Sequence, residues 1–213
     1  METAAAGHIL LLLAFLALGC TAPSPGTQPD AMSAEAHRSE AAEHEREAGE
    51  HERRYDESAE VPDERDRYPQ EFEAYNPTAS YLRLAHEHRR QARQHLDAAH
   101  GLEQFEAAEC APFVPRTRAM CPLLGQVEEV DDIPGGVRVR LAKGVPRHAA
   151  AAHMRCHLAF ARARKRTGMQ ACPLYLPGVG VELPPNSDAI DLLVADPRDV
   201  KALRLRTRGH LGQ

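Results

Sequence analysis

The chain has 213 residues, of which 43% are hydrophobic and 27% charged, and its formal net charge is −5. This length is enough for one compact domain of roughly 100–150 residues together with an extended part. Only 5% of the residues are aromatic. Side chains able to stack on bases are therefore scarce, and we expect no nucleic-acid partner.

The chain opens with an almost unbroken apolar run from Ile9 to Leu18. This run is shorter than the roughly 20 residues that a membrane-spanning helix needs. It closes with the sequence Leu-Ala-Leu-Gly-Cys at residues 16–20. An apolar core followed by small residues is typical of a secretory signal. Ala17 stands where Leu is usual, yet the stretch resembles the lipobox of bacterial lipoproteins.

This resemblance implies a signal peptide over residues 1–19 and a lipidated Cys20 that anchors the chain in a bilayer. Thr21, rather than Asp, follows the cysteine. In a Gram-negative cell, the resemblance then implies an outer-membrane location facing the periplasm. Residues 20–30 are rich in Pro, Gly and small polar residues, so we expect the lipidated cysteine to be followed by a short tether.

The two halves of the chain carry opposite charge. Residues 1–109 contain 10 Lys and Arg against 22 Asp and Glu, whereas residues 110–213 contain 16 against 9. Such a split predicts two structural units that attract each other. We therefore expect an acidic unit over 31–109 and a basic domain over 110–213.

The acidic unit contains a repeat of Ala-x-x-His every seven residues. It begins at Ala34, Ala41 and Ala48, and it returns in the same register at Ala85 and Ala92. Apolar positions three apart in a seven-residue repeat are typical of packed helices. We predict helices over about 31–57 and 79–109, joined by a Pro-punctuated loop over 58–78. The two helices should pack with their histidines at the seam, so that His44 faces the stretch from His88 to His95.

Histidines at a helix seam could hold a metal ion. Successive heptad positions lie about 10.5 Å apart along one helix, too far to share an ion. A site therefore needs histidines from both helices or a carboxylate one turn away. The candidate ligands are His44, Glu47, His51, His88 and His95. The other interpretation is a hairpin whose imidazoles only stack and hydrogen-bond.

The basic half is predicted to be α+β, with the order β-β-α-β-β-α. The strands are expected at 123–130, 137–141, 175–183 and 189–195, and the first helix at 146–166. Asp196 and Pro197 fit the start of the last helix. A small antiparallel sheet with helices on one face follows from this order.

Cysteine use agrees with export. Besides Cys20, the chain has Cys110, Cys121, Cys156 and Cys172. An even number of cysteines in an exported domain predicts disulfides. Three pairings are possible, and proximity in sequence favours Cys110–Cys121 with Cys156–Cys172. One metal ion held by all four thiolates is a further alternative.

A second metal candidate is His153 with His157, because residues four apart share a helical face. Met154 stands where zinc proteases have Glu, and His153 stands where haem attachment needs Cys. No enzyme motif is present, so we do not expect an enzyme. The basic run over 162–166 and the arginines near the C-terminus are typical of a solvated helix end, and the alternative is docking on an acidic surface, including the chain's own hairpin.

These observations predict a membrane-anchored extracytoplasmic lipoprotein with a structural or protein-interaction role. Its hairpin could bind a partner protein or a second copy of the chain. The alternative is a periplasmic protein that binds and sequesters a divalent metal, with zinc or copper held by the helical histidines.

Overall fold

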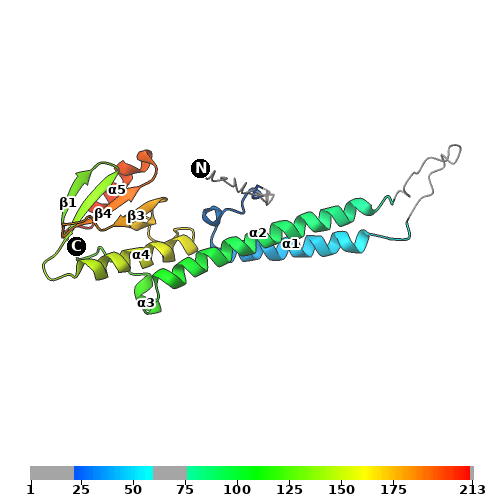
Figure 1. The fold of residues 1–213 in the computed structure, drawn as a ribbon, viewed down its shortest axis with the longest axis horizontal. Coiled ribbons are helices and arrows are strands. Elements are labelled where there is room, and N and C mark those ends of the chain that lie inside the picture. The colour runs from blue at the N-terminus through cyan, green and yellow to red at the C-terminus, as the bar shows by residue number, and fades with distance from the viewer. Residues whose placement is uncertain (1–21, 60–75, 212–213) are drawn as a thin grey trace, which may run out of the picture.

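The protein consists of a long helical hairpin and a compact α+β part, which we call the head (Figure 1). The computed structural model describes residues 22–59 and 76–211. The signal segment, Cys20 and the middle of the predicted loop therefore lie outside the described residues. The hairpin is formed by α1 (Ala34–Arg54) and α2 (Ala79–Glu109). Among the described residues, no helix is both long and apolar enough to cross a membrane.

The two predicted hairpin helices are confirmed, with a later start and an earlier end for α1. Pro29–Ala31 forms a 3-10 turn, and the chain is extended at Met32 and Ser33. The Ser33 hydroxyl then accepts a hydrogen bond from the backbone N–H of Ala36 at 3.1 Å. This cap satisfies one of the free donors at the helix start, which sets the start at Ala34. Extended Tyr55 ends the helix.

The heptad alanines form the contact between α1 and α2. The five alanines of the repeat and Ala99, one heptad after Ala92, are all buried, with exposed fractions between 0% and 6%. Because Ala has only a methyl side chain, the two helices approach closely along this stripe. The contacting histidines run in opposite directions on the two helices, since His37 meets His95 and His44 meets His88. The hairpin is therefore antiparallel, as the sequence predicts.

The head is an antiparallel sheet covered on one face by helices. The strands are β1 (Val127–Ile133), β2 (Gly136–Leu141), β3 (Val179–Glu182) and β4 (Ile190–Val194), in the order β1-β2-β4-β3. The helices are α3 (Pro115–Arg118), α4 (Arg147–Ala163) and α5 (Val200–Arg208). The predicted order of strands and main helices is confirmed, and α3 is an additional short turn of helix.

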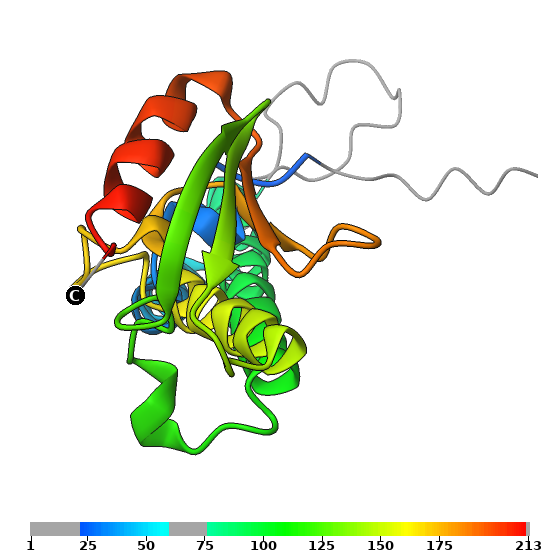
Figure 2. The same ribbon diagram turned by 90° about the vertical axis from the view of Figure 1, so that its left-hand side faces the viewer.

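The alternation of apolar and charged side chains along the strands decides which face of the sheet the helices cover. Val137 and Val139 on β2, with Ile190 and Leu192 on β4, are fully buried in one cluster with Met154 of α4 and Leu203 of α5. The opposite face is charged: Arg138 donates two hydrogen bonds of 2.8 Å to Asp191. Hence α4 and α5 lie on the same face of the sheet (Figure 2).

The first and third strands differ most from the sequence prediction. The first strand begins at Val127 rather than at residue 123, because residues 122–126 form successive turns, and it continues to Ile133 rather than ending at residue 130. The third strand was predicted from residue 175, yet Pro173–Tyr175 is a 3-10 turn and β3 begins only at Val179. Gly178, with φ of +68°, separates the two elements. Apolar residues before these strands belong to buried turns rather than to the sheet.

The predicted disulfide pairing is wrong. Cys110 is bonded to Cys156, with Cα atoms 4.6 Å apart, whereas Cys121 and Cys172 are free thiols that face each other. The physical reason is that the end of α2 packs against the middle of α4. This tertiary contact brings together cysteines that are 46 residues apart in sequence. The structure also excludes one metal ion held by all four thiolates.

Opposite charges meet where the hairpin joins the head, as the charge split predicts. Arg164 of the basic run binds Glu106 of α2 at 2.8 Å, and Arg162 and Arg166 both contact Asp30 at 3.3 Å. These pairs are partly exposed, so each contributes only about 0–1 kcal/mol. The C-terminal arginines bind within the head instead, with Arg204 and Arg208 on Asp132.

Candidate functional site

The seam of the hairpin holds a continuous column of aromatic rings, which we call the imidazole column. Along it, successive rings come alternately from α1 and α2. The order is His37, His95, His44, His88, His51 and Tyr81, with centroid separations of 5.3, 5.6, 5.4, 5.3 and 6.0 Å. The column follows from antiparallel packing of two helices that carry the same heptad.

In two contacts of this column, the same ring atom, Nδ1, of two histidines meets. The Nδ1 atoms of His37 and His95 are 3.0 Å apart, and those of His44 and His88 are 3.2 Å apart. A hydrogen bond between two Nδ1 atoms requires one of them to carry the proton and the other to be bare. Each pair therefore keeps at least one lone pair directed into the seam.

Glu47 joins the second pair and completes a three-residue cluster. Its Oε2 atom lies 3.3 Å from Nδ1 of His44 and 2.9 Å from Nδ1 of His88. We call His44, Glu47 and His88 the seam cluster. All three residues are half-buried, and their three potential ligand atoms lie within 4.8 Å of one another. The arrangement contains both kinds of ligand that the sequence suggests as alternatives: histidines from both helices and a carboxylate one turn away.

The spacing of the three atoms suits a tetrahedral metal ion. Metal–ligand bonds of about 2.0–2.1 Å at tetrahedral angles place two ligand atoms roughly 3.3 Å apart. The observed separations in the seam cluster are 3.2, 3.3 and 2.9 Å. Two nitrogens and one carboxylate oxygen thus outline one face of a coordination tetrahedron, and the fourth position remains for water.

The other predicted seam ligands flank this cluster rather than join it. His95 is buried against His37, and its pKa is lowered by burial and, to a smaller extent, by His37 and His44. His51 stacks on His88. Its buried Nδ1 atom has no hydrogen-bond partner among the described residues. Both rings therefore lie beside the cluster without adding a ligand atom to it.

The second predicted pair, His153 and His157, is not brought together as ligands of one ion. The Nε2 atom of His153 lies 2.8 Å from the carbonyl oxygen of Thr117, and Nδ1 of His157 lies 2.8 Å from that of Arg118. The two rings thus share a helical face, as predicted, but each binds the backbone of the neighbouring segment.

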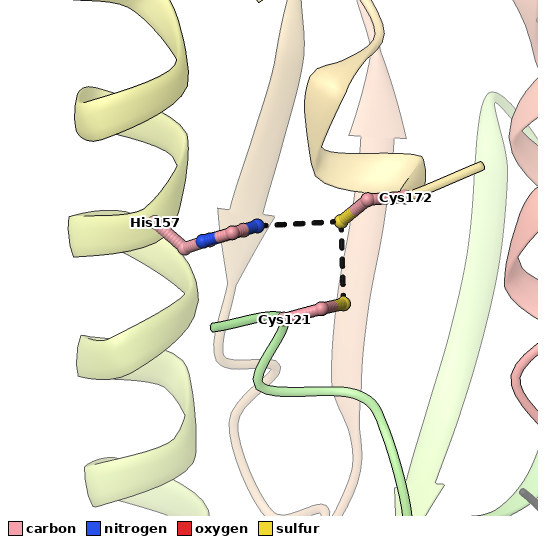
Figure 3. Close-up of side chains that lie close together, drawn as sticks. All are labelled: Cys121, His157 and Cys172. Atoms are coloured by element: carbon pink, nitrogen blue, oxygen red, sulfur yellow. Dashed lines mark hydrogen bonds between the residues drawn. The ribbon is translucent and has the colours of Figure 1, made fainter. Parts of the chain in front are cut away.

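His157 instead points its other nitrogen at the two free thiols (Figure 3). Its Nε2 atom is 3.5 Å from Sγ of Cys172, which is 3.2 Å from Sγ of Cys121. The sequence does not predict a link between His157 and these cysteines, because no short motif joins the three positions. His37 belongs to the same heptad as the predicted seam ligands but is not among them.

No protein-family model matches the chain, and no curated protein or solved structure matches it either. The geometry of the two clusters is therefore the basis for any statement about function.

Proposed function

We propose that this protein binds and sequesters a divalent transition metal at the seam cluster of its hairpin. One observation carries this proposal: the nitrogens of His44 and His88 and the Glu47 oxygen converge from both helices at tetrahedral separations. Two imidazoles and one carboxylate suit Zn²⁺ or Cu²⁺ better than Ca²⁺ or Mg²⁺, which prefer sets of oxygen ligands.

Partial exposure of the cluster supports reversible binding. The side chains of His44 and His88 are each 21% exposed and that of Glu47 is 36% exposed. An ion can therefore reach the cluster without unfolding of the hairpin, and solvent can fill the open coordination position. The ion would replace the shared proton between the two Nδ1 atoms, so its affinity should fall in acid.

The proposal includes anchoring of the chain through lipids on Cys20. Its support is the lipobox resemblance at residues 16–20 and the tether that follows. A lipid anchor would hold the metal-binding hairpin at a membrane surface. The structural or interaction role predicted from the sequence, including self-association through the hairpin, stays a prediction.

Zinc titration of the full chain in detergent, followed by calorimetry, tests the seam site. We expect His88→Ala to abolish one zinc-binding event, because only two protein ligands remain. His100→Ala is the matched control, since His100 is exposed on the same helix and should leave the titration unchanged. If His88→Ala and the unaltered chain bind zinc alike, the imidazole column is only a packing device.

A further inference from the structure

A second cluster of potential metal ligands lies inside the head. Cys121, His157 and Cys172 are no more than 6% exposed, and their ligand atoms lie within 4.8 Å of one another (Figure 3). They come from three segments: the turn before β1, helix α4 and the 3-10 turn before β3. The separation of the two sulfur atoms, 3.2 Å, is well above the roughly 2.05 Å of a disulfide bond.

The hydrogen bonds of His157 prepare its Nε2 atom as a ligand. A carbonyl oxygen can only accept, so the 2.8 Å contact with Arg118 requires the proton on Nδ1 of His157. The Nε2 atom of the neutral ring then presents its lone pair to Cys172. Burial lowers the pKa of His157, which favours this neutral form. Metal-bound histidines typically show the same outer hydrogen bond to a carbonyl.

His210 makes a similar hydrogen bond to a backbone carbonyl. Its Nδ1 atom lies 2.9 Å from the carbonyl oxygen of Arg206, so Nδ1 carries a proton and Nε2 is the ring atom that could bind a metal ion. His210 is buried and close to Cys121. The pKa of the Cys121 thiol is lowered chiefly by its contact with Cys172, and His210 adds a smaller contribution.

We propose that Cys121, His157 and Cys172 bind a zinc ion in the head, separate from the seam cluster, and that His210 supplies the fourth ligand. Two sulfurs and two imidazole nitrogens are a common set for closed, four-coordinate structural zinc. Zinc–sulfur bonds of about 2.3 Å would place the sulfurs roughly 3.8 Å apart. The thiols therefore need to separate by only a few tenths of an ångström from their 3.2 Å contact.

The position of the site in the fold indicates which elements a bound ion would connect and how it could enter. His210 follows α5, so the ion would fasten the end of this helix to α4 and to both turns. A surface hollow of about 680 Å³ is lined by Cys172 and His210 together with apolar Leu124 and Leu205. Zinc can approach the two ligands through this hollow.

The test uses the full chain carrying His88→Ala, which removes the seam cluster and so separates the two proposals. The protein is expressed with zinc, purified in detergent, and analysed for bound zinc and for thiols that react with an alkylating reagent. We expect one zinc ion per chain, with Cys121 and Cys172 reactive only after the ion is chelated. Replacement of zinc by Co²⁺ should produce a thiolate-to-metal charge-transfer absorption.

Ligand variants locate the ion. Cys172→Ser and His210→Ala should weaken zinc binding by more than about 100-fold, beyond the cost of losing an outer hydrogen-bond partner. His153→Ala is the matched control, because this ring lies one turn from His157 but binds the Thr117 carbonyl. A Cys121–Cys172 disulfide without zinc in the isolated protein would overturn the proposal. Unchanged zinc affinity in Cys172→Ser would overturn it too. The cobalt spectrum is measured without any substitution in the head, so it tests the site even if a head variant fails to fold.

Discussion

At the scale of single residues, Gly136 decides how closely two strands of the sheet can pair. A Cβ atom at this position would lie 1.9 Å from the carbonyl oxygen of Leu192 and 2.9 Å from its carbonyl carbon. Both are backbone atoms of the neighbouring strand β4, so they cannot move aside as a flexible side chain would. The start of β2 therefore tolerates only glycine.

We predict that Gly136→Ala lowers the free energy of unfolding by about 1–3 kcal/mol or more, because β2 and β4 must separate locally. Urea denaturation followed by circular dichroism measures this change. Gly180→Ala is the matched control, since a Cβ atom there would meet nothing within 4 Å in the edge strand β3. Equal stability of both variants would show that the two strands pair less closely than described.

At the scale of the helical elements, the hairpin packs imidazole rings against one another along its seam. It has almost no large apolar side chain at its seam, where alanines and histidines alternate. His95 is buried against His37, and a charge on its ring would be poorly solvated there. The folded hairpin therefore resists protonation of His95 more than the unfolded chain does.

Acid should destabilise the hairpin. The pKa of His95 is lowered in the folded protein from its ordinary value of 6.5, by burial first and then by His37 and His44. Above about pH 6.5, His95 is neutral in both states and its contribution to stability is complete. As the pH falls through 6.5, the unfolded chain takes up the proton first, and that stability is lost.

Thermal melting followed by circular dichroism at pH 7.5 and pH 5, in metal-free buffer, measures this loss. We predict a lower melting temperature at pH 5, and a smaller difference for His95→Gln because one of the perturbed groups is removed. His157, whose pKa is also lowered by burial, should keep part of the pH dependence. His100→Gln, at an exposed position of the same helix, should behave like the unaltered chain.

At the scale of the whole molecule, a disulfide, several ion pairs and a small apolar cluster that includes Leu102 of α2 and Ala163 of α4 join the hairpin to the head within the described residues. The Cys110–Cys156 disulfide ties the end of α2 to the middle of α4. Glu106 of α2 adds contacts to Arg118 and Arg164 of the head. Because the ion pairs are weak and partly exposed, the disulfide should stabilise this junction more than the ion pairs do.

We predict that the double variant Cys110→Ser with Cys156→Ser loses about 4 kcal/mol of unfolding free energy, the loop entropy expected for a separation of 46 residues. Urea denaturation of oxidised protein measures the difference. The unaltered chain should lose a similar amount when reduced. A variant as stable as the oxidised chain would mean that packing of α2 on α4 alone holds the junction.

The proposed lipid anchor at Cys20 also concerns the whole molecule. We predict that Cys20→Ser abolishes incorporation of labelled lipid and prevents normal processing, because the thiol is the acceptor of the lipid in the proposed lipoprotein. Metabolic labelling and membrane fractionation measure both effects. Cys172→Ser should still be labelled. Unchanged lipid labelling of the Cys20→Ser protein would contradict the anchor.

Much of the hairpin and of its seam cluster could be predicted from the sequence. The heptad at Ala34, Ala41 and Ala48 recurs at Ala85 and Ala92, and this periodicity determines both the helices and the buried face. The structure confirms that His44 faces His88 and His95. The prediction succeeded because heptad packing depends on local periodicity, which a single sequence displays.

Which cysteines of the head meet could not be predicted from the sequence and became clear only from the tertiary structure. Local residue patterns determined its strands, its helices and the α+β class, but not which cysteines meet. Cys110 joins Cys156 because α2 packs on α4, and Cys121 meets Cys172 and His157 because two distant turns close over the same helix. Such contacts depend on how whole elements pack, since side chains from remote segments meet only when the core closes. The sequence by itself thus determined the elements and the imidazole column, and only the tertiary structure decided the disulfide and the buried cluster of thiols and imidazoles.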